Sequence, residues 1–204
     1  MGPSGLSLGG KITNWPAPQT GALRFKVSNK TQFAVGPTTA VDGNGNFANL
    51  LLPSSEVADQ LVTTPNDPAC AGVNFNPPTA SSATASIEVL NANNLVVGTV
   101  NESTKDFNNS QTVLANGDKQ VLRTYANTNV TLKGVCTTQT AGKTTYNLNL
   151  VKGWNIVIVE FTKVTATAIE ETTVSTGGLP ADIKLFYSTV TANAVKFNPF
   201  LSGR

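Results

Sequence analysis

The sequence predicts an all-β protein: an antiparallel β-sandwich with one short helix and a long proline-rich loop. Apolar and polar residues alternate with a period of two along most of the chain, as in strands with one buried face. Glycine, asparagine and aspartate interrupt these stretches at short intervals, which is typical of turns between strands. Charged residues make up only 13% of the chain, against about a quarter in typical globular proteins, so the polar surface consists mostly of neutral hydrogen-bonding groups.

The chain of 204 residues is predicted to form one sandwich domain over residues 11–204, because the part before the proline-rich loop is too short to be stable alone. Residues 1–10 are rich in glycine and serine, so we expect a flexible N-terminal tether. Met1 is either a cloning start or stands where an exported lipoprotein carries its lipidated cysteine. In the second case the protein would be attached to a membrane only through that anchor.

Residues 22–29 illustrate the expected strands. Leu23, Phe25 and Val27 would lie on the buried face of this strand, and the two basic residues between them on the exposed face. The same alternation predicts strands over residues 10–15, 32–35, 85–91, 95–101, 119–126, 129–136, 145–151, 154–164 and 182–190.

One short helix is expected over residues 53–62. A serine can cap its N-terminus, Glu56 complements the helix dipole, and the apolar residues share one face. Residues 63–86 follow as a long loop, because prolines recur there among small polar residues. Cys70 lies in this loop, so we expect the loop to be pinned to the sandwich.

The absence of histidine, with 0 residues in the chain, excludes several kinds of chemistry. It removes the commonest general base near neutral pH and the commonest transition-metal ligand. Ser-His-Asp and Cys-His catalysis are therefore excluded, and two cysteines are too few for a structural zinc site. We expect no cofactor. The net charge of +2, without runs of lysine or arginine, predicts no binding to nucleic acid or to an anionic membrane.

Cys70 and Cys136 are expected to form a disulfide. An exported chain with two cysteines and a loose loop gains stability from such a crosslink. The alternative is a free thiol, which nothing basic beside either cysteine would activate. The pairing indicates an oxidising compartment.

The segment VDGNGNF, residues 41–47, is either a calcium loop or a tight turn. Asp42, Asn44 and Asn46 have the spacing of the first ligands of a calcium loop. However, Phe47 stands where that loop needs glycine, and Pro53 where it needs glutamate. The favoured interpretation is a turn between two strands, with a weakly bound Ca²⁺ as the alternative.

Aromatic side chains are the candidates for a ligand platform. Trp15, Tyr125, Tyr146, Trp154 and Tyr187 could bind a sugar if their rings were exposed and coplanar on one sheet. The alternative is that these rings belong to an ordinary core.

The carboxylates offer little sign of catalysis. Glu170 and Glu171 are adjacent, so in a strand they point to opposite faces and cannot share a substrate. Glu160 falls on the same face as Ile156 and Ile158, where it either reaches solvent, pairs with a lysine or acts as a catalytic acid. A hydrolase using carboxylates alone would bring two acids together in a cleft.

Two segments suggest a family. GKITNWPAPQTGALRFKV and AVDGNGNFANLLLP together resemble the opening strands of carboxypeptidase-regulatory-like, transthyretin-like β-sandwich modules of exported bacterial proteins. LVKGWNIVIVEF is similar to a hairpin of bacterial surface lipoproteins. The resemblance covers about the first third of the chain. It implies an immunoglobulin- or transthyretin-like sandwich that serves as a scaffold or binding unit without catalytic residues.

These observations together predict a non-enzymatic β-sandwich of the bacterial cell envelope. It would be periplasmic, anchored at the outer membrane or extracellular, and would act as a structural or protein-binding module through neutral strand faces rich in threonine and asparagine. Its partner would be an envelope or surface protein, with a glycan as the alternative. The competing classes are a carbohydrate-binding module and a carboxylate-only hydrolase.

Overall fold

The computed structural model describes residues 5–16, 19–28, 33–53, 57, 62–63, 70, 72–138 and 142–189. The described part of the chain is nearly all β and contains no α-helix, so the predicted all-β class is confirmed, in a sandwich-like arrangement. No helix in these ranges is long and apolar enough to cross a membrane. The strands are β1 (Gly5–Lys11), β2 (Gly21–Ser28), β3 (Phe33–Val35), β4 (Thr39–Val41), β5 (Asn46–Pro53), β6 (Val62–Thr63), β7 (Asn74–Asn76), β8 (Ser81–Leu90), β9 (Val96–Ser103), β10 (Lys119–Ala126), β11 (Val130–Thr138), β12 (Gly142–Leu150), β13 (Gly153–Val164), β14 (Ile169–Thr176) and β15 (Lys184–Thr189).

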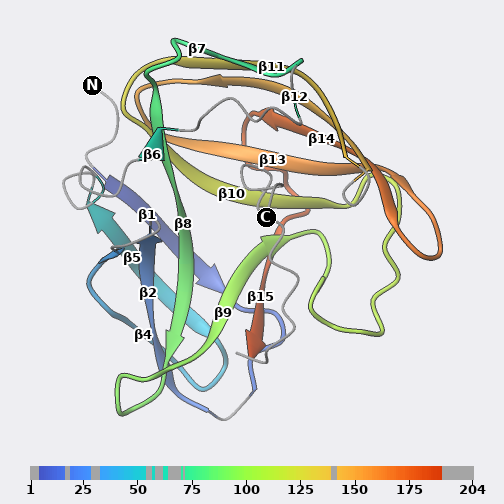
Figure 1. Ribbon diagram of the computed structural model, residues 1–204. Coiled ribbons are helices and arrows are strands. Elements are labelled where there is room, and N and C mark those ends of the chain that lie inside the picture. The colour runs from blue at the N-terminus through green and yellow to red at the C-terminus, as the bar shows by residue number, and fades with distance from the viewer. Residues whose placement is uncertain are drawn as a thin grey trace.

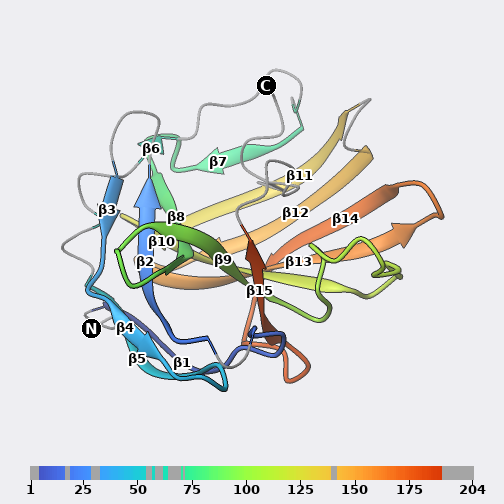
Figure 2. The same ribbon diagram turned by 90° about the horizontal axis from the view of Figure 1, so that it is seen from below.

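The strands form a small sheet and a large one. β1 pairs with β5 in a 2-stranded sheet, and a 13-stranded sheet has the order β3-β2-β8-β9-β10-β13-β14-β12-β11-β7, with β4, β6 and β15 off this path. The long strand β8 joins the two halves of the molecule, because its first half pairs with β10 and its second half with β9 (Figure 1). Seen from below, β11, β12, β14 and β13 lie side by side in that order (Figure 2).

The first core lies in the N-terminal half, between the β1–β5 sheet and the strands around β2 and β8. The alternation predicted for β2 is confirmed, since Leu23, Phe25 and Val27 are all fully buried. Leu50 of β5 and Ile87 of β8 belong to the same cluster. The small sheet therefore covers one face of the large sheet and completes a sandwich.

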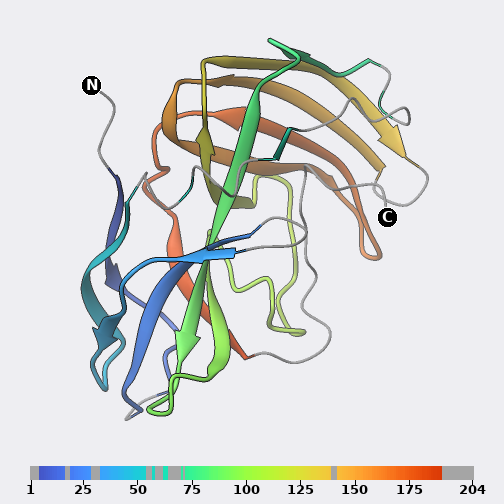
Figure 3. The same ribbon diagram turned by 60° about the vertical axis from the view of Figure 1, so that its left-hand side comes forward.

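The second core lies under one face of the C-terminal strands, which bow over the N-terminal half (Figure 3). Leu132 of β11, Leu148 of β12, Val174 of β14 and Val159 of β13 each have an exposed fraction of 1% or less. Cys70 and other residues of the segment before β8 pack against this face. Each of these strands thus buries every second side chain.

One pairing departs from the predicted antiparallel arrangement. β14 pairs antiparallel with β13 but parallel with β12. Although β12 and β13 are consecutive in the chain, β14 lies between them in the sheet. The amide of Asn155 closes the connection between the separated strands, because it donates to the carbonyl of Val151 and accepts from the same residue's N–H.

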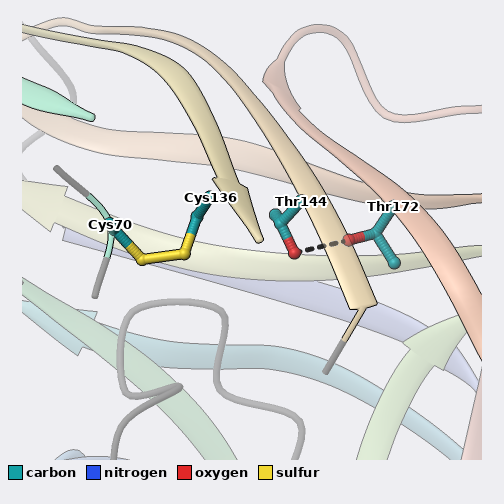
Figure 4. Close-up of a disulfide and its surroundings, with 4 residues drawn as sticks. All are labelled: Cys70, Cys136, Thr144 and Thr172. Carbon is teal, nitrogen blue, oxygen red and sulfur yellow. Dashed lines mark hydrogen bonds between the residues drawn. A yellow bond between two sulfur atoms is a disulfide. The ribbon is translucent and has the colours of Figure 1, made fainter. Parts of the chain in front are cut away.

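The predicted disulfide between Cys70 and Cys136 is present (Figure 4). It fixes the segment before β7 to β11, and both cysteines are buried in the second core. Beside it, Gly134 has φ 139° and lies so close to Gly72 that a Cβ atom on Gly134 would collide with the carbonyl of Gly72. Close backbone contact at the two glycines therefore lets this segment pack on the strand.

Ion pairs to buried glutamates link neighbouring strands, between the two halves and within the N-terminal half. Arg123 of β10 donates two hydrogen bonds to Glu102 of β9, at 2.9 Å and 2.6 Å. Glu88 of β8 accepts from both Arg24 and Lys26 of β2, at 2.7 Å and 3.1 Å. Since both glutamates are buried, removing a basic partner would leave a carboxylate without a counter-charge.

Four predicted segments differ from the structure. The predicted strand 10–15 extends only to Lys11, the end of β1, because Thr13 and Asn14 form a turn. Residues 5–10 of the predicted tether 1–10 belong to β1, because their backbone pairs with β5. Of the predicted helix 53–62, Pro53 ends β5 and Val62 begins β6, Val57 is buried, and the rest lies outside the described residues. The predicted loop 63–86 contains β7 and the start of β8, where small residues pair with β10 without an apolar pattern.

We predict that the Cys70→Ser/Cys136→Ser double variant is less stable than the parent by about 4 kcal/mol, because the disulfide closes a loop with a sequence separation of 66 and restricts the unfolded chain. Urea unfolding of the two proteins measures the difference. Thiol titration of the unfolded, unreduced parent should detect no free sulfhydryl, and detection of free thiols or equal stability would contradict the prediction.

Candidate functional site

The segment VDGNGNF forms the turn between β4 and β5. One carboxylate oxygen of Asp42 accepts hydrogen bonds from the backbone N–H groups of Asn44 and Asn46, both at 2.8 Å, and the other accepts from the Asn46 side-chain amide at 2.9 Å. The hydrogen bonds from Asn46 hold the pKa of Asp42 below its usual value. Asp42 therefore acts as the internal acceptor of an Asx turn. The part of the chain that the structure describes contains no cluster of ligands suited to a metal ion.

The second glycine of this turn has a packing role. Gly45 has φ 84°, and a Cβ atom there would lie 2.7 Å from the Cβ of Trp15. Its carbonyl accepts from the N–H of Ile12 at 2.9 Å. The turn thus holds the end of β1 against the first core, which accounts for a glycine at this position.

A shallow, open depression of about 430 Å³ lies beside the turn. Its lining consists of four apolar residues and of Asp42 and Asn46, which are bonded to each other. The apolar residues are Ala40, Val41, Phe47 and Ala48. This depression offers little chemistry, because its carboxylate already stabilises the turn.

The aromatic residues considered for a ligand platform lie apart and are mostly packed. Trp15 is buried and meets Tyr187 edge to face at 5.5 Å and 67°. The Trp15 indole N–H donates to the Gln19 carbonyl at 2.7 Å, and burial raises the pKa of Tyr187. These two rings therefore belong to the first core.

The other three rings do not complete a platform. Tyr125 and Trp154 meet at 75° with centroids 5.5 Å apart and pack beside the first core. The indole Nε1 of Trp154 is buried and has no hydrogen-bond partner among the residues that the structure describes, so it is not exposed to a ligand. Tyr146 is buried in the second core. The described rings thus lack the exposed, coplanar arrangement that sugar stacking requires.

A further candidate binding surface is one face of the four strands β11, β12, β14 and β13. On the opposite face nearly every side chain is buried, whereas each side chain on this one is at least partly exposed. We call it the outer face. It consists of Thr131, Lys133, Val135 and Thr137 of β11, Lys143, Thr145, Asn147 and Asn149 of β12, Glu171, Thr173 and Ser175 of β14, and Ile156, Ile158 and Glu160 of β13.

Strand register aligns these side chains in rows across the outer face. In one row Thr145 lies between Thr173 of β14 and Val135 of β11. Glu160 of β13 lies opposite Thr173 and continues the row. Because paired residues point to the same side of a sheet, the row presents hydroxyl groups in its middle.

The neighbouring row has a similar character. Asn147 lies between Ser175 of β14 and Lys133 of β11, and Ile158 of β13 lies opposite Ser175. The centre of the face is therefore neutral and can both donate and accept hydrogen bonds.

The acids of interest in the sequence have different surroundings. Glu170 pairs with Lys163 at 2.6 Å and Glu171 with Lys143 at 3.2 Å, both on the surface. Glu160 shares its face with Ile156 and Ile158, as predicted, and is partly exposed. The pairing of both neighbouring glutamates with lysines suits a solvated surface better than a pair of catalytic acids.

Comparison with known proteins gives no relative: no protein family, curated protein or solved structure matches the chain. The outer face therefore has to be interpreted from its own chemistry. Alternation in the sequence indicates that single strands have neutral faces. It does not indicate that β14 inserts between β12 and β13 and brings four such strands together.

We predict that Asp42→Ala lowers the melting temperature at neutral pH, because three hydrogen bonds of the turn lose their acceptor. Since the folded-state pKa of Asp42 lies below 3.8, the ionised carboxylate stabilises the fold above that pH. The difference between the variant and the parent should therefore shrink as pH falls below 3.8 through the lowered pKa.

Thermal unfolding between neutral and acidic pH measures this effect. Asn44→Ala is the matched control, because the Asn44 side chain is exposed in the same turn. If the Asp42→Ala variant melted at the same temperature as the parent, the turn would not depend on this carboxylate and the prediction would be contradicted. A rise with Ca²⁺ that this variant abolishes would support a calcium site instead.

Proposed function

We propose that this protein is a non-enzymatic module of the cell envelope that binds a protein partner through the outer face. The observation that carries the proposal is the four-strand surface on which neutral hydroxyl and amide groups lie in register, above strands whose other face is buried. A rigid backbone fixes these groups, so little conformational entropy is lost when they are covered.

The chemistry of the outer face favours a protein over the other partner classes. The face contains two lysines and two glutamates, so it has no net charge with which to attract nucleic acid or anionic lipid. The ring that adjoins it along β13, Trp154, packs against Tyr125 beside the first core, so the face offers no open ring on which a sugar could stack. Hydroxyl and amide groups beside isolated aliphatic side chains are typical of the mixed polar surface in non-obligate protein interfaces.

The disulfide supports the proposed location. The bond between Cys70 and Cys136 is compatible with an extracellular or periplasmic protein, because disulfides persist in oxidising compartments. We further propose that the protein lies in the cell envelope and that it is related to the transthyretin-like modules of exported proteins.

We predict that the double variant Thr145→Arg/Asn147→Arg fails to capture the partner that the parent recovers from envelope extract. Two long charged side chains would stand at the centre of the outer face and keep the partner surface away. The measurement is a pull-down followed by mass spectrometry, with unfolding curves to confirm that the variant is folded.

Thr38→Arg/Asn93→Arg is the matched control, because it places the same side chains at an exposed threonine and an exposed asparagine outside this face. The control should capture the partner as well as the parent does. Equal capture by both double variants, or no defined partner for the parent, would contradict the proposed function.

A further inference from the structure

Two unpaired charges stand at opposite sides of the outer face. Lys133 lies on β11 and Glu160 on β13, with β12 and β14 between them. Neither side chain belongs to an ion pair among the described residues. Lys119 of β10 is opposite Glu160 in register but does not form an ion pair with it.

Each of these charges has an aliphatic neighbour on the same face. Val135 follows Lys133 by two residues and is 45% exposed, and Ile158 precedes Glu160 by two residues and is partly exposed. Both sides of the face therefore carry a charge beside an apolar side chain, and the charges have opposite sign.

This arrangement of charges is complementary to itself when a second copy is related by a two-fold rotation. A symmetric dimer needs a patch that is complementary to itself. If the two-fold axis runs roughly along the strands, the β13 side of one copy faces the β11 side of the other. Lys133 and Glu160 lie in neighbouring rows, so they are offset by roughly 7 Å along the strands. Both side chains are long, and packed sheets cross at about 30°, so Glu160 comes within reach of the other copy's Lys133, twice in the dimer.

We propose that the outer face binds the outer face of a second copy of this chain. The inference rests on the proposed function, since it uses the same surface and names a second copy of this chain as one of its protein partners. The hydroxyl and amide rows form the centre of the interface, and the Lys133 and Glu160 pairs set its register.

The size of the face indicates a weak dimer. Four strands at the usual spacing and seven residues of length give a surface of roughly 450 Å² per copy. A stable interface buries about 800 Å² per partner. We therefore expect association that depends on concentration and that weakens when salt screens the charge pairs.

Charge reversal tests the inference. In a dimer of the Lys133→Glu variant, two negative charges meet at each of the two pairs. In a dimer of the Glu160→Lys variant, two positive charges meet there. Each variant alone should dimerise at least about tenfold more weakly than the parent, because like charges meet. An equimolar mixture of the two should recover the parent's association, because every Glu then meets a Lys of the other variant. Sedimentation velocity over a range of concentrations measures all three samples.

Lys152→Glu is the matched control, because Lys152 is an exposed lysine in the β12–β13 connection, off the outer face, and this variant should associate like the parent. A parent that stays monomeric at high concentration, or variants that do not recover on mixing, would overturn the inference. If the parent were monomeric and still captured an envelope protein through Thr145 and Asn147, only the self-association would fail. Unfolding curves for each variant exclude loss of fold as the cause.

Discussion

The two-residue period of an extended strand determines the character of both faces of the C-terminal half. Leu148 of β12 and Val174 of β14 point into the second core, so the residues next to each of them along its own strand must point outward. A shift of one residue in the register of any of these strands would bury threonine and asparagine and expose leucine and valine. Burial of the core therefore holds the side chains of the outer face in their arrangement.

Several contacts maintain this register across the molecule. β8 takes part in both halves, the Arg123–Glu102 pair joins β9 to β10, and the disulfide holds a covering segment on β11. Within the second core, the hydroxyl of Thr172 donates to that of Thr144 at 3.0 Å, so the parallel pair of β12 and β14 has a buried polar contact at a defined position (Figure 4). Such a satisfied pair favours one register over its neighbours.

Local patterns in the sequence predict most strands but not their partners. Strands with regular alternation, such as β2 and β13, are evident from the sequence, and the disulfide follows because only two cysteines are present. β1 escapes prediction because its glycines suggest a flexible tether, whereas its backbone pairs with β5. The insertion of β14 depends on contacts between distant segments, which no local pattern records. The places of the five aromatic residues could not be predicted from the sequence either, because the fold separates them into two different cores.

Hydroxyl-radical footprinting of the protein, free and bound to its partner from envelope extract, tests the central claim most directly. If the outer face is the binding surface, oxidation of Val135 should fall on binding, because this side chain is 45% exposed when free. Val113 and Leu95, which are 80% and 61% exposed outside the face, should be oxidised equally in both states. Protection of Val113 or Leu95 with unchanged oxidation of Val135 would contradict the account.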